Sequence, residues 1–282
     1  MIASRQVMMS ISDGEFSRFR GFIYSNFGIN LTEEKKTLVV GRMQKYLREN
    51  SFDTFSKYLD WLEANPTADN LSELVNRIST NHTYFYREPE HFDYMNEFAL
   101  PEIDKLLSKE KSKDLRIWCA AAATGEEPYT IVTSLMEYYG NEYNRIDAGL
   151  LATDISTKAL GLARQGIYSE EKFYHTSESI KNKYFNKLPD GQHYKVVDKV
   201  RKEVLFKRLN LMRERFPFKK KFHIIFCRNV MIYFDKKTRD NLVQKLYDNT
   251  IEGGYLFVGH SETLQRSTCP YKYVKPAIYQ KV

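Results

Sequence analysis

The sequence predicts an α/β protein with a mostly parallel sheet and a helical region ahead of it. Residues 13 to about 80 carry apolar side chains at helical spacing. From Leu115 onward, short apolar runs alternate with helical stretches, which is typical of a parallel sheet covered on both faces. We therefore expect an N-terminal helical domain with its linker over residues 1–85 and a second domain over residues 86–282.

The N-terminal region is predicted to contain four helices. The first opens near Asp13, and the second follows Thr32, where Thr-Glu-Glu is a typical helix start. Two more are expected around residues 53–63 and 68–78, separated by a break at Asn65-Pro66. The second helix carries basic residues largely off its apolar face, namely Lys35, Arg42, Lys45 and Arg48.

The second domain is predicted to alternate strands and helices. Strands are expected at residues 115–119, 149–153, 222–227 and 255–258, and helices near residues 129–139, 157–165 and 236–249. The alternation is interrupted where Tyr194–Val197 and Glu203–Lys207 resemble short strands beside turns. We expect a small antiparallel β insertion at about residues 181–208.

The composition excludes several classes of protein. No apolar run approaches the roughly 20 residues that span a bilayer, and no cleavable leader is recognisable, so we expect a cytoplasmic protein without membrane insertion. The three cysteines include no CxxC pair, which argues against a disulfide framework or a zinc site. The formal net charge of +7 favours an acidic partner, which is nucleic acid, an anionic membrane or an acidic protein.

A loop of small residues, Ala120–Gly125, lies between the first predicted strand and its helix. Small side chains let a ligand approach the backbone closely. The loop lacks GxGxxG and the P-loop lysine, and the acids Glu126 and Glu127 would repel phosphate. These acids suit a ligand with ammonium and sulfonium charges, such as S-adenosylmethionine. Taken alone, the loop is equally well interpreted as a tight packing turn.

Polar residues also follow two further predicted strands. Asp154 is placed to accept hydrogen bonds from ribose hydroxyls; the alternative is a cap of the next helix, which either Asp154 or Ser156 could form. With the loop of small residues, it favours an adenosyl ligand. Arg228 and Asn229 follow a buried strand without the two prolines that amine methyltransferases often carry here, which argues against methylation of nucleic-acid bases. The polar and aromatic segment 81–88 is a possible lid, although an ordinary linker is the preferred interpretation of its sequence alone.

Together these segments resemble the CheR-type chemotaxis-receptor glutamate methyltransferases over most of the chain. The matching blocks are Thr-Asn-x-Thr-x-Phe-x-Arg-Glu at 80–88, Ala-Ala-x-Thr-Gly-Glu-Glu-Pro-Tyr at 121–129, Ala-Thr-Asp-Ile at 152–155, Asn-Leu at 210–211, Cys-Arg-Asn-Val-Met-Ile-Tyr-Phe at 227–234 and Gly-His-Ser-Glu at 259–262. The resemblance implies a Rossmann-like S-adenosylmethionine-dependent methyltransferase domain with an N-terminal helical domain and a small β insertion. It also implies methyl transfer to glutamate side chains of chemoreceptors, giving methyl esters and S-adenosylhomocysteine in sensory adaptation.

The resemblance implies which residues hold the cofactor. They are Asn81, Thr83 and Arg87 on the linker side, Glu126 or alternatively Glu127 at the methionyl amino group, Asp154 at the ribose hydroxyls, Asn210 and Leu211 at the adenine, and Arg228 and Asn229 at the methionyl side. Arg87 and Tyr233 are expected nearest the transferred methyl group. A glutamate with a pKa near 4.3 is already ionised at neutral pH, so the reaction requires no general base and we expect no metal. Arg87 would steer this carboxylate and Tyr233 would donate a hydrogen bond to it.

The implied partner is the cytoplasmic helical methylation region of chemoreceptors, which is rich in acidic residues. Lys35, Arg42, Lys45 and Arg48 are candidates for docking it, and a solvated helix face is the alternative for each of them. The β insertion is short around Asp190-Gly191, so we expect recognition without a tether to the receptor C-terminus. We also expect a monomer.

Two rival functions remain to be compared. A methyltransferase acting on nucleic acid would agree with the positive charge, but it predicts aromatic residues interleaved with a basic groove, so we expect no nucleic-acid partner. A non-catalytic signalling module would have lost some of the cofactor blocks, and here they are intact.

Overall fold

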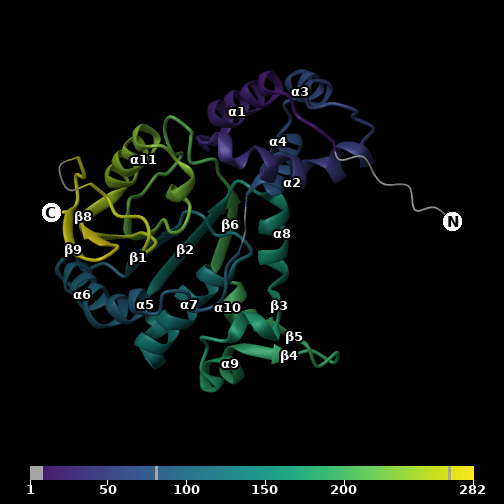
Figure 1. Cartoon of the computed structure of the whole chain (residues 1–282). Coiled ribbons are helices and arrows are strands. Elements are labelled where there is room, and N and C mark those ends of the chain that lie inside the picture. The colour runs from purple at the N-terminus through teal and green to yellow at the C-terminus, as the bar shows by residue number, and fades with distance from the viewer. Residues whose placement is uncertain (1–8, 80–81, 266–267) are drawn as a thin grey trace. The chain divides into compact units, whose positions relative to one another are not determined.

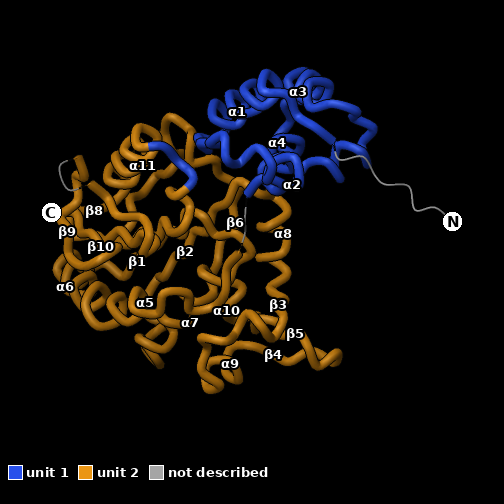
Figure 2. The backbone as a smooth tube through the Cα atoms, in the orientation of Figure 1, with its two compact units in different colours: residues 1–80, 233–235 blue, residues 81–232, 236–282 orange. Residues whose placement is uncertain are grey.

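The computed structural model describes residues 9–79, 82–265 and 268–282 (Figure 1). The chain divides into two compact units (Figure 2). The helical unit comprises residues 1–80 and 233–235, and the larger unit comprises residues 81–232 and 236–282. The grouping of residues 233–235 with the helical unit is not predicted by the sequence.

The helical unit contains four α-helices in its described part. They are α1 (Asp13–Phe27), α2 (Lys36–Glu49), α3 (Phe55–Ala64) and α4 (Ala68–Ile78), and a 3-10 turn, Glu33–Lys35, precedes α2. Ser12 starts α1 with a capping box, in which its side chain accepts a hydrogen bond from the N–H of Glu15 and the Glu15 carboxylate accepts one in return. Gly28, at φ 70°, ends α1 in the left-handed conformation that favours glycine. The sequence signals at these helix ends therefore act as expected.

Apolar side chains of the four helices form the interior of the helical unit. Phe19 and Phe55 meet edge to face with ring centroids 5.8 Å apart, and both are fully buried. The segment 233–235 joins this unit through main-chain contacts. The N–H of Asn30 donates to the carbonyl of Tyr233 at 2.8 Å, and Ile29 forms a β-bridge with Phe234.

The larger unit is built on a seven-stranded mixed sheet with the order β6-β2-β1-β7-β8-β10-β9. Its strands are β1 (Asp114–Cys119), β2 (Asp147–Asp154), β6 (Val204–Arg208), β7 (Phe222–Phe226), β8 (Thr250–Phe257), β9 (Lys272–Lys275) and β10 (Ile278–Gln280). The first five strands of this order are parallel, and β10 pairs antiparallel with both β8 and β9. The predicted parallel core is therefore present, with an antiparallel edge.

The described part of the larger unit also contains α-helices. They are α5 (Glu90–Tyr94), α6 (Leu100–Lys109), α7 (Glu126–Tyr139), α8 (Thr157–Gln165), α9 (Glu178–Tyr184), α10 (Asp198–Arg201) and α11 (Lys236–Asp248), with a π-helical turn at Met95–Ala99 and 3-10 turns at Gly140–Arg145, Glu170–Phe173 and Met231–Tyr233. Helices α7 and α8 contact β2 and β6, and α6 and α11 contact β8. None of the helices in the described ranges is both long enough and apolar enough to cross a bilayer.

A separate three-stranded antiparallel sheet has the order β3-β5-β4. Its strands are β3 (Ile167–Ser169), β4 (Phe185–Lys187) and β5 (His193–Val196). The expectation that Glu203–Lys207 belongs to this insertion is wrong, because β6 pairs parallel with β2 in the main sheet. The alternating burial of β6 explains the error. It is an edge strand with Leu205 exposed, so its sequence looks like that of a half-buried antiparallel strand.

The carboxyl ends of four parallel strands meet at one edge of the main sheet. In register, Cys119 of β1 lies beside Ala152 of β2 and Phe226 of β7, and Phe226 lies beside Phe257 of β8. The rings of Phe226 and Phe257 stack with their centroids 4.6 Å apart, which stabilises this edge. The loops that follow β1, β2 and β7 therefore lie side by side, which is where ligands bind in sheets of this kind.

Candidate functional site

The loops at this edge carry unusual backbone conformations. Among the described residues, seven other than glycine have a positive φ, and four of them lie here: Tyr86 at 55°, Glu88 at 56°, Ala123 at 45° and Asn229 at 57°. Such conformations cost energy and persist where surrounding contacts impose them, often at functional sites. The contacts around these loops therefore fix their backbone conformation.

The loop of small residues after β1 is fixed by main-chain hydrogen bonds. The N–H of Ala120 donates to the carbonyl of Phe226, and the N–H of Ala122 donates to the carbonyl of Thr153. A Cβ at Gly125, where φ is 98°, would lie 2.8 Å from both Ala163 Cβ and the Tyr168 hydroxyl. The alternative of a tight packing turn is thus correct for Gly125, while Ala120–Ala123 form the part of the loop that lines the edge.

Asp154 lies at the end of β2 and accepts two main-chain hydrogen bonds. Its Oδ2 accepts from the N–H of Ala123 at 2.9 Å, and its Oδ1 accepts from the N–H of Ser156 at 2.8 Å. Burial raises the pKa of Asp154, and these bonds oppose the shift. Ser156 caps α8, because its hydroxyl accepts from the N–H of Ala159. The capping role therefore falls to Ser156, and each oxygen of Asp154 keeps a lone pair for a ligand hydroxyl.

Asn210 and Leu211 follow β6 beside Asp154. The N–H of Leu209 donates to the carbonyl of Asp154 at 3.0 Å, which brings this loop to the same edge. The side-chain oxygen of Asn210 accepts from the N–H of Met212, and Leu211 is buried. The structure therefore places together the residues expected at the ribose and at the adenine.

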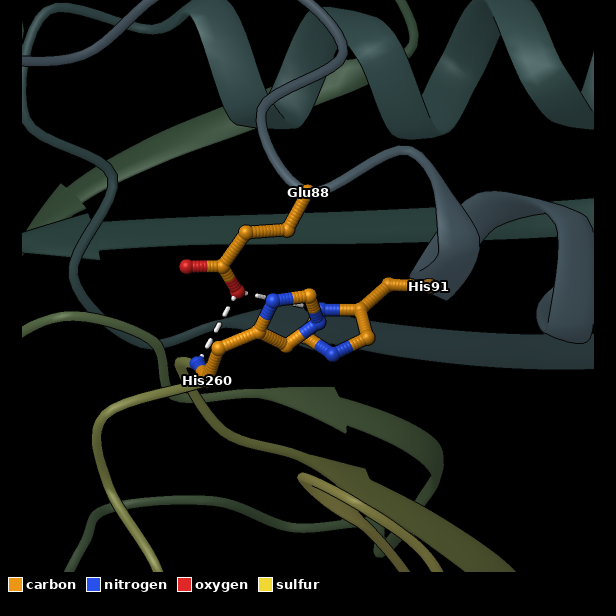
Figure 3. A group of neighbouring side chains, drawn as sticks. All are labelled: Glu88, His91 and His260. Atoms are coloured by element: carbon orange, nitrogen blue, oxygen red, sulfur yellow. Dashed lines mark hydrogen bonds and ion pairs between the residues drawn. The ribbon is translucent and has the colours of Figure 1, made fainter.

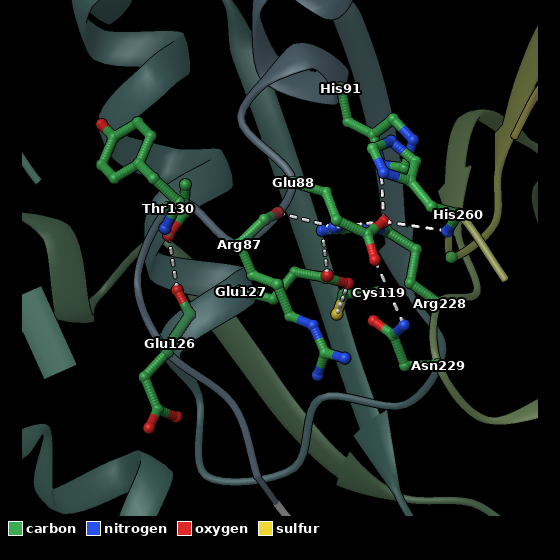
Figure 4. A network of polar contacts seen from close by, with 12 residues as sticks. Arg87, Glu88, His91, Cys119, Glu126, Glu127, Thr130, Arg228, Asn229 and His260 are labelled. Carbon is green, nitrogen blue, oxygen red and sulfur yellow. Dashed lines mark hydrogen bonds and ion pairs between the residues drawn. The ribbon is translucent and has the colours of Figure 1, made fainter. Parts of the chain in front are cut away.

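Glu126 and Glu127 have different surroundings (Figure 4). Glu126 points away from Arg228 and is fully buried, accepts from the Thr124 hydroxyl at 2.6 Å, and lies 3.3 Å from Lys172 Nζ. Burial raises its pKa. Glu127 accepts from Arg228 Nη1 at 2.5 Å and from the Cys119 thiol at 3.3 Å, between the ends of β1 and β7. Glu127 therefore belongs to the Arg228 network, while Glu126 Oε1 is buried without a hydrogen-bond partner among the described residues, and which acid faces a ligand stays a prediction.

Arg228 is the centre of the polar network in Figure 4. Its side chain is 1% exposed, and Nη2 donates to the carbonyl of Arg87 at 2.6 Å and to Glu88 Oε2 at 3.0 Å, while Nη1 binds Glu127. Burial opposes the charge of Arg228, but Glu127 and Glu88 together raise its pKa. Arg228 therefore joins the 82–88 segment to the loops after β1 and β7.

A second buried acid, Glu262, holds the loop after β7. It is 2% exposed and accepts hydrogen bonds from the N–H groups of Gly259, Asn229 and Ile232, at 2.6, 2.7 and 3.1 Å. The side-chain amide of Asn229 donates to Glu88 Oε1 at 3.3 Å. No role for Glu262 or Glu88 was predicted from the sequence. Their presence in the family-like blocks was the one available signal.

Glu88, His91 and His260 form a compact cluster (Figure 3). Their ligand atoms lie within 4.8 Å of one another, as in a metal site. However, Glu88 Oε2 already accepts from the N–H of His260 and from Arg228, whose charge would repel a cation. We therefore interpret the cluster as a positioning element, and the absence of a metal stays a prediction.

His91 is expected to make the stability of the larger unit depend on pH. It is 1% exposed, and burial lowers its pKa to about 3. In the unfolded chain it binds a proton below about pH 6.5. Because the unfolded state binds more protons between these values, the free energy of unfolding falls as the pH is lowered through this range, by up to about 1.4 kcal/mol per pH unit.

Urea unfolding of wild type and His91→Phe at several pH values measures this effect. Phenylalanine preserves the packing of the ring, which lies 5.7 Å from that of Phe257. In His91→Phe, the number of protons taken up on unfolding should be smaller by about one in this pH range, so the free energy of unfolding should change less with pH. The exposed His175, changed to Gln, is the control. Equal pH dependence in wild type and His91→Phe would contradict the assignment.

The 82–88 segment is anchored in the larger unit. Phe85 is buried and stacks on Phe173 at 4.7 Å. Arg87 is half-buried, donates to the carbonyl of His82 at 2.9 Å, and lies beside the network of Arg228 (Figure 4). Thr83 is buried, and its carbonyl accepts from Lys172 Nζ. The linker interpretation is therefore incomplete, because the segment contributes to the edge. Asn81 lies outside the described residues.

Tyr233 belongs to the helical unit. Its ring lies 5.9 Å from Lys35 Nζ, and its carbonyl accepts a hydrogen bond from the N–H of Asn30.

The basic residues expected to dock a partner have different surroundings. Lys45 and Arg48 are exposed on α2, where they line a shallow hollow with Gln44 and Glu49. Lys35 belongs to the preceding 3-10 turn, and Arg42 donates to the carbonyl of Ile78 within the unit. The four therefore do not form one free basic face.

Comparisons with known proteins cover nearly the whole chain. The family model described as CheR methyltransferase, SAM binding domain, matches residues 81–279, and the CheR methyltransferase all-alpha domain matches residues 14–79. The chain is 45% identical to a chemotaxis protein methyltransferase of Borreliella burgdorferi, covering 97% of this chain and 96% of that protein. It is 37% identical to a probable chemotaxis protein methyltransferase of Rhizobium etli, covering 85% and 89%. It is 34% identical to the chemotaxis protein methyltransferase of Escherichia coli, covering 90% and 86%.

Proposed function

Because the chain belongs to the CheR methyltransferase family, we propose that it transfers the methyl group of S-adenosylmethionine to glutamate side chains of chemoreceptors. The observation that carries the proposal is the convergence of the family-like blocks on one edge of the sheet. There the buried Arg228 joins Glu127, Glu88 and the backbone of Arg87. Asp154 lies at the end of the second strand of the same edge.

The residues at this edge fit the cofactor. Asp154 has lone pairs for the ribose hydroxyls, and the loop Ala120–Ala123 carries methyl side chains that allow close approach. Glu126, or alternatively Glu127, would offer a carboxylate to the methionyl ammonium. Asn210 and Leu211 would hold the adenine. The remaining contacts with the cofactor would come from Arg228, Asn229, Thr83 and Asn81. When bound, the cofactor supplies a methyl group on a positively charged sulfur.

The proposed acceptor is a glutamate carboxylate, which is ionised at neutral pH and needs no base. The protein's task is then to align this carboxylate and to exclude water. Arg87 would steer the carboxylate by charge, and Tyr233 would donate a hydrogen bond to it. Arg228 holds the main chain of Arg87 through its carbonyl, so the position of Arg87 depends on the buried network.

The proposed partner is the acidic helical methylation region of a receptor. Lys45 and Arg48, whose side chains are exposed on α2, are the residues of the helical unit proposed to meet its carboxylates. Lys45 lies 3.7 Å from Glu49, an exposed pair that contributes little to stability and can be exchanged for a partner's acid.

Transfer of labelled methyl groups tests the proposed function. A purified cytoplasmic receptor fragment is incubated with the protein and with S-adenosylmethionine labelled on its methyl group. We expect label in the fragment that mild alkali releases as volatile methanol, because methyl esters hydrolyse under conditions that leave N-methyl groups intact. A fragment with its methyl-accepting glutamates changed to alanine is the control. Alkali-stable label, or no transfer by the folded protein, would contradict the proposal.

A further inference from the structure

Three aromatic side chains of the larger unit, the half-buried Tyr84 and the exposed Tyr174 and His175, gather next to Arg87. The ring of Tyr84 lies 4.5 Å from that of Tyr174 and 5.5 Å from that of His175, and Tyr174 and His175 are 4.5 Å apart. Tyr174 is 60% exposed, and exposed aromatic side chains that cluster together often mark a binding surface. We call Tyr84, Tyr174 and His175 the aromatic patch.

The aromatic patch is held by the fold before any partner arrives. Tyr84 and Tyr174 come from two segments that are joined by hydrogen bonds, because the N–H of Phe85 donates to the carbonyl of Lys172 at 3.1 Å. Lys172 Nζ donates in turn to the carbonyl of Thr83 at 2.7 Å. Below the patch, Phe85 packs against Phe173 in the core. Such preorganised aromatic side chains bind with a small loss of conformational entropy.

The aromatic patch is continuous with the residue proposed to steer the acceptor. The Arg87 guanidinium lies 5.8 Å from the ring of Tyr84. A protein segment that presents a glutamate to Arg87 would therefore rest on the patch. Tyrosine and arginine, together with tryptophan, are enriched among the residues that contribute most of the binding energy at protein interfaces.

The chemistry of the patch fits an acidic helical segment. The hydroxyls of Tyr84 and Tyr174, the His175 imidazole and Arg87 can donate hydrogen bonds, which carboxylates accept. The rings would cover the aliphatic stems of glutamates and the apolar side chains between them. The acids of the neighbouring segment have partners, because Glu170 pairs with Lys181 and Glu171 accepts from the Ser169 hydroxyl.

We infer that the aromatic patch docks the acidic helical segment that carries the methyl-accepting glutamate and so determines which glutamates are modified. This inference rests on the proposed function and deepens it. It assigns substrate recognition to the larger unit, beside the reacting groups, in addition to any contribution from α2.

Steady-state methylation of a purified cytoplasmic receptor fragment by a Tyr84→Ala/Tyr174→Ala variant tests the inference. We expect the KM for the fragment to rise about tenfold, with kcat changed less than about twofold, because the patch binds the protein segment and not the reacting atoms. The affinity for S-adenosylhomocysteine, measured by calorimetry, should stay unchanged. Phe98→Ala is the matched control, because Phe98 is 47% exposed and stacks on Tyr94 at 5.0 Å elsewhere in the unit.

The outcomes separate the inference from the proposed function. An unchanged KM in the folded double variant, or a KM raised equally by Phe98→Ala, overturns the inference and leaves the proposed function standing. A loss of S-adenosylhomocysteine affinity with the rise in KM also overturns it, because the patch would then belong to the cofactor site. If wild type fails to methylate the fragment, the proposed function fails and the inference with it.

Discussion

Replacing Arg228 by alanine is expected to lower the free energy of unfolding of the larger unit by about 3–5 kcal/mol. The substitution leaves the carboxylates of Glu127 and Glu88 beside each other without their cation, and these side chains are only 13% and 15% exposed. It also removes the donor to the carbonyl of Arg87. The binding of S-adenosylhomocysteine should be lost together with the stability, because the same network shapes the edge of the sheet.

Urea unfolding followed by circular dichroism measures the effect of Arg228→Ala. Arg145→Ala is the control, because Arg145 forms an exposed pair with Glu142 and should cost less than about 1 kcal/mol. Adding Glu127→Gln to Arg228→Ala should restore part of the stability, since it removes one of the two uncompensated charges. A cost below about 1 kcal/mol for Arg228→Ala would show that the buried network does not hold the site together.

Replacing Arg87 by alanine is expected to lower kcat for methyl transfer by about 100- to 1,000-fold while the fold stays intact. Arg87 is half-buried, and its guanidinium donates to the carbonyl of His82 near the surface, so the core does not depend on it. The loss follows from the removal of the charge that would steer the acceptor carboxylate. Arg87→Lys should keep part of the activity, because it retains the charge without the planar donor geometry.

Initial rates with labelled S-adenosylmethionine measure the effect of Arg87→Ala, and the thermal unfolding of the variant shows whether it is folded. Arg164→Ala is a matched control in the same unit, because this arginine also donates to a single main-chain carbonyl, that of Phe206 at 3.0 Å. Its activity should stay within about twofold of wild type. Normal turnover by Arg87→Ala would rule out the steering role.

The features that depend on local sequence were predictable. The apolar runs and turn signals gave the parallel strands β1, β2, β7 and β8 and the helices between them, because these elements are set by periodicity and by residues at their ends. The strand β6 was misassigned because a half-buried edge strand has the same alternation in a parallel sheet and in an antiparallel one. Periodicity alone does not distinguish the two.

The contacts that shape the site were not predictable from local sequence. Glu88 meets Arg228 across 140 positions of the chain, and Glu262 reaches back to Asn229. Only the fold brings these groups together. Local sequence leaves the choice between Glu126 and Glu127 open for a geometric reason. Consecutive residues of a helix project about 100° apart, so the position of α7 on the sheet decides which one faces the edge.

Calorimetric titration with S-adenosylhomocysteine tests the central claim most directly. Wild type should bind, and Asp154→Ala should bind far more weakly, because it loses the acceptors proposed for the ribose hydroxyls. Ser156→Ala, which removes the cap of α8 from the same loop, should bind nearly as well as wild type. If the folded wild type does not bind, or if Asp154→Ala binds equally well, the carboxyl edge of the sheet is not the cofactor site.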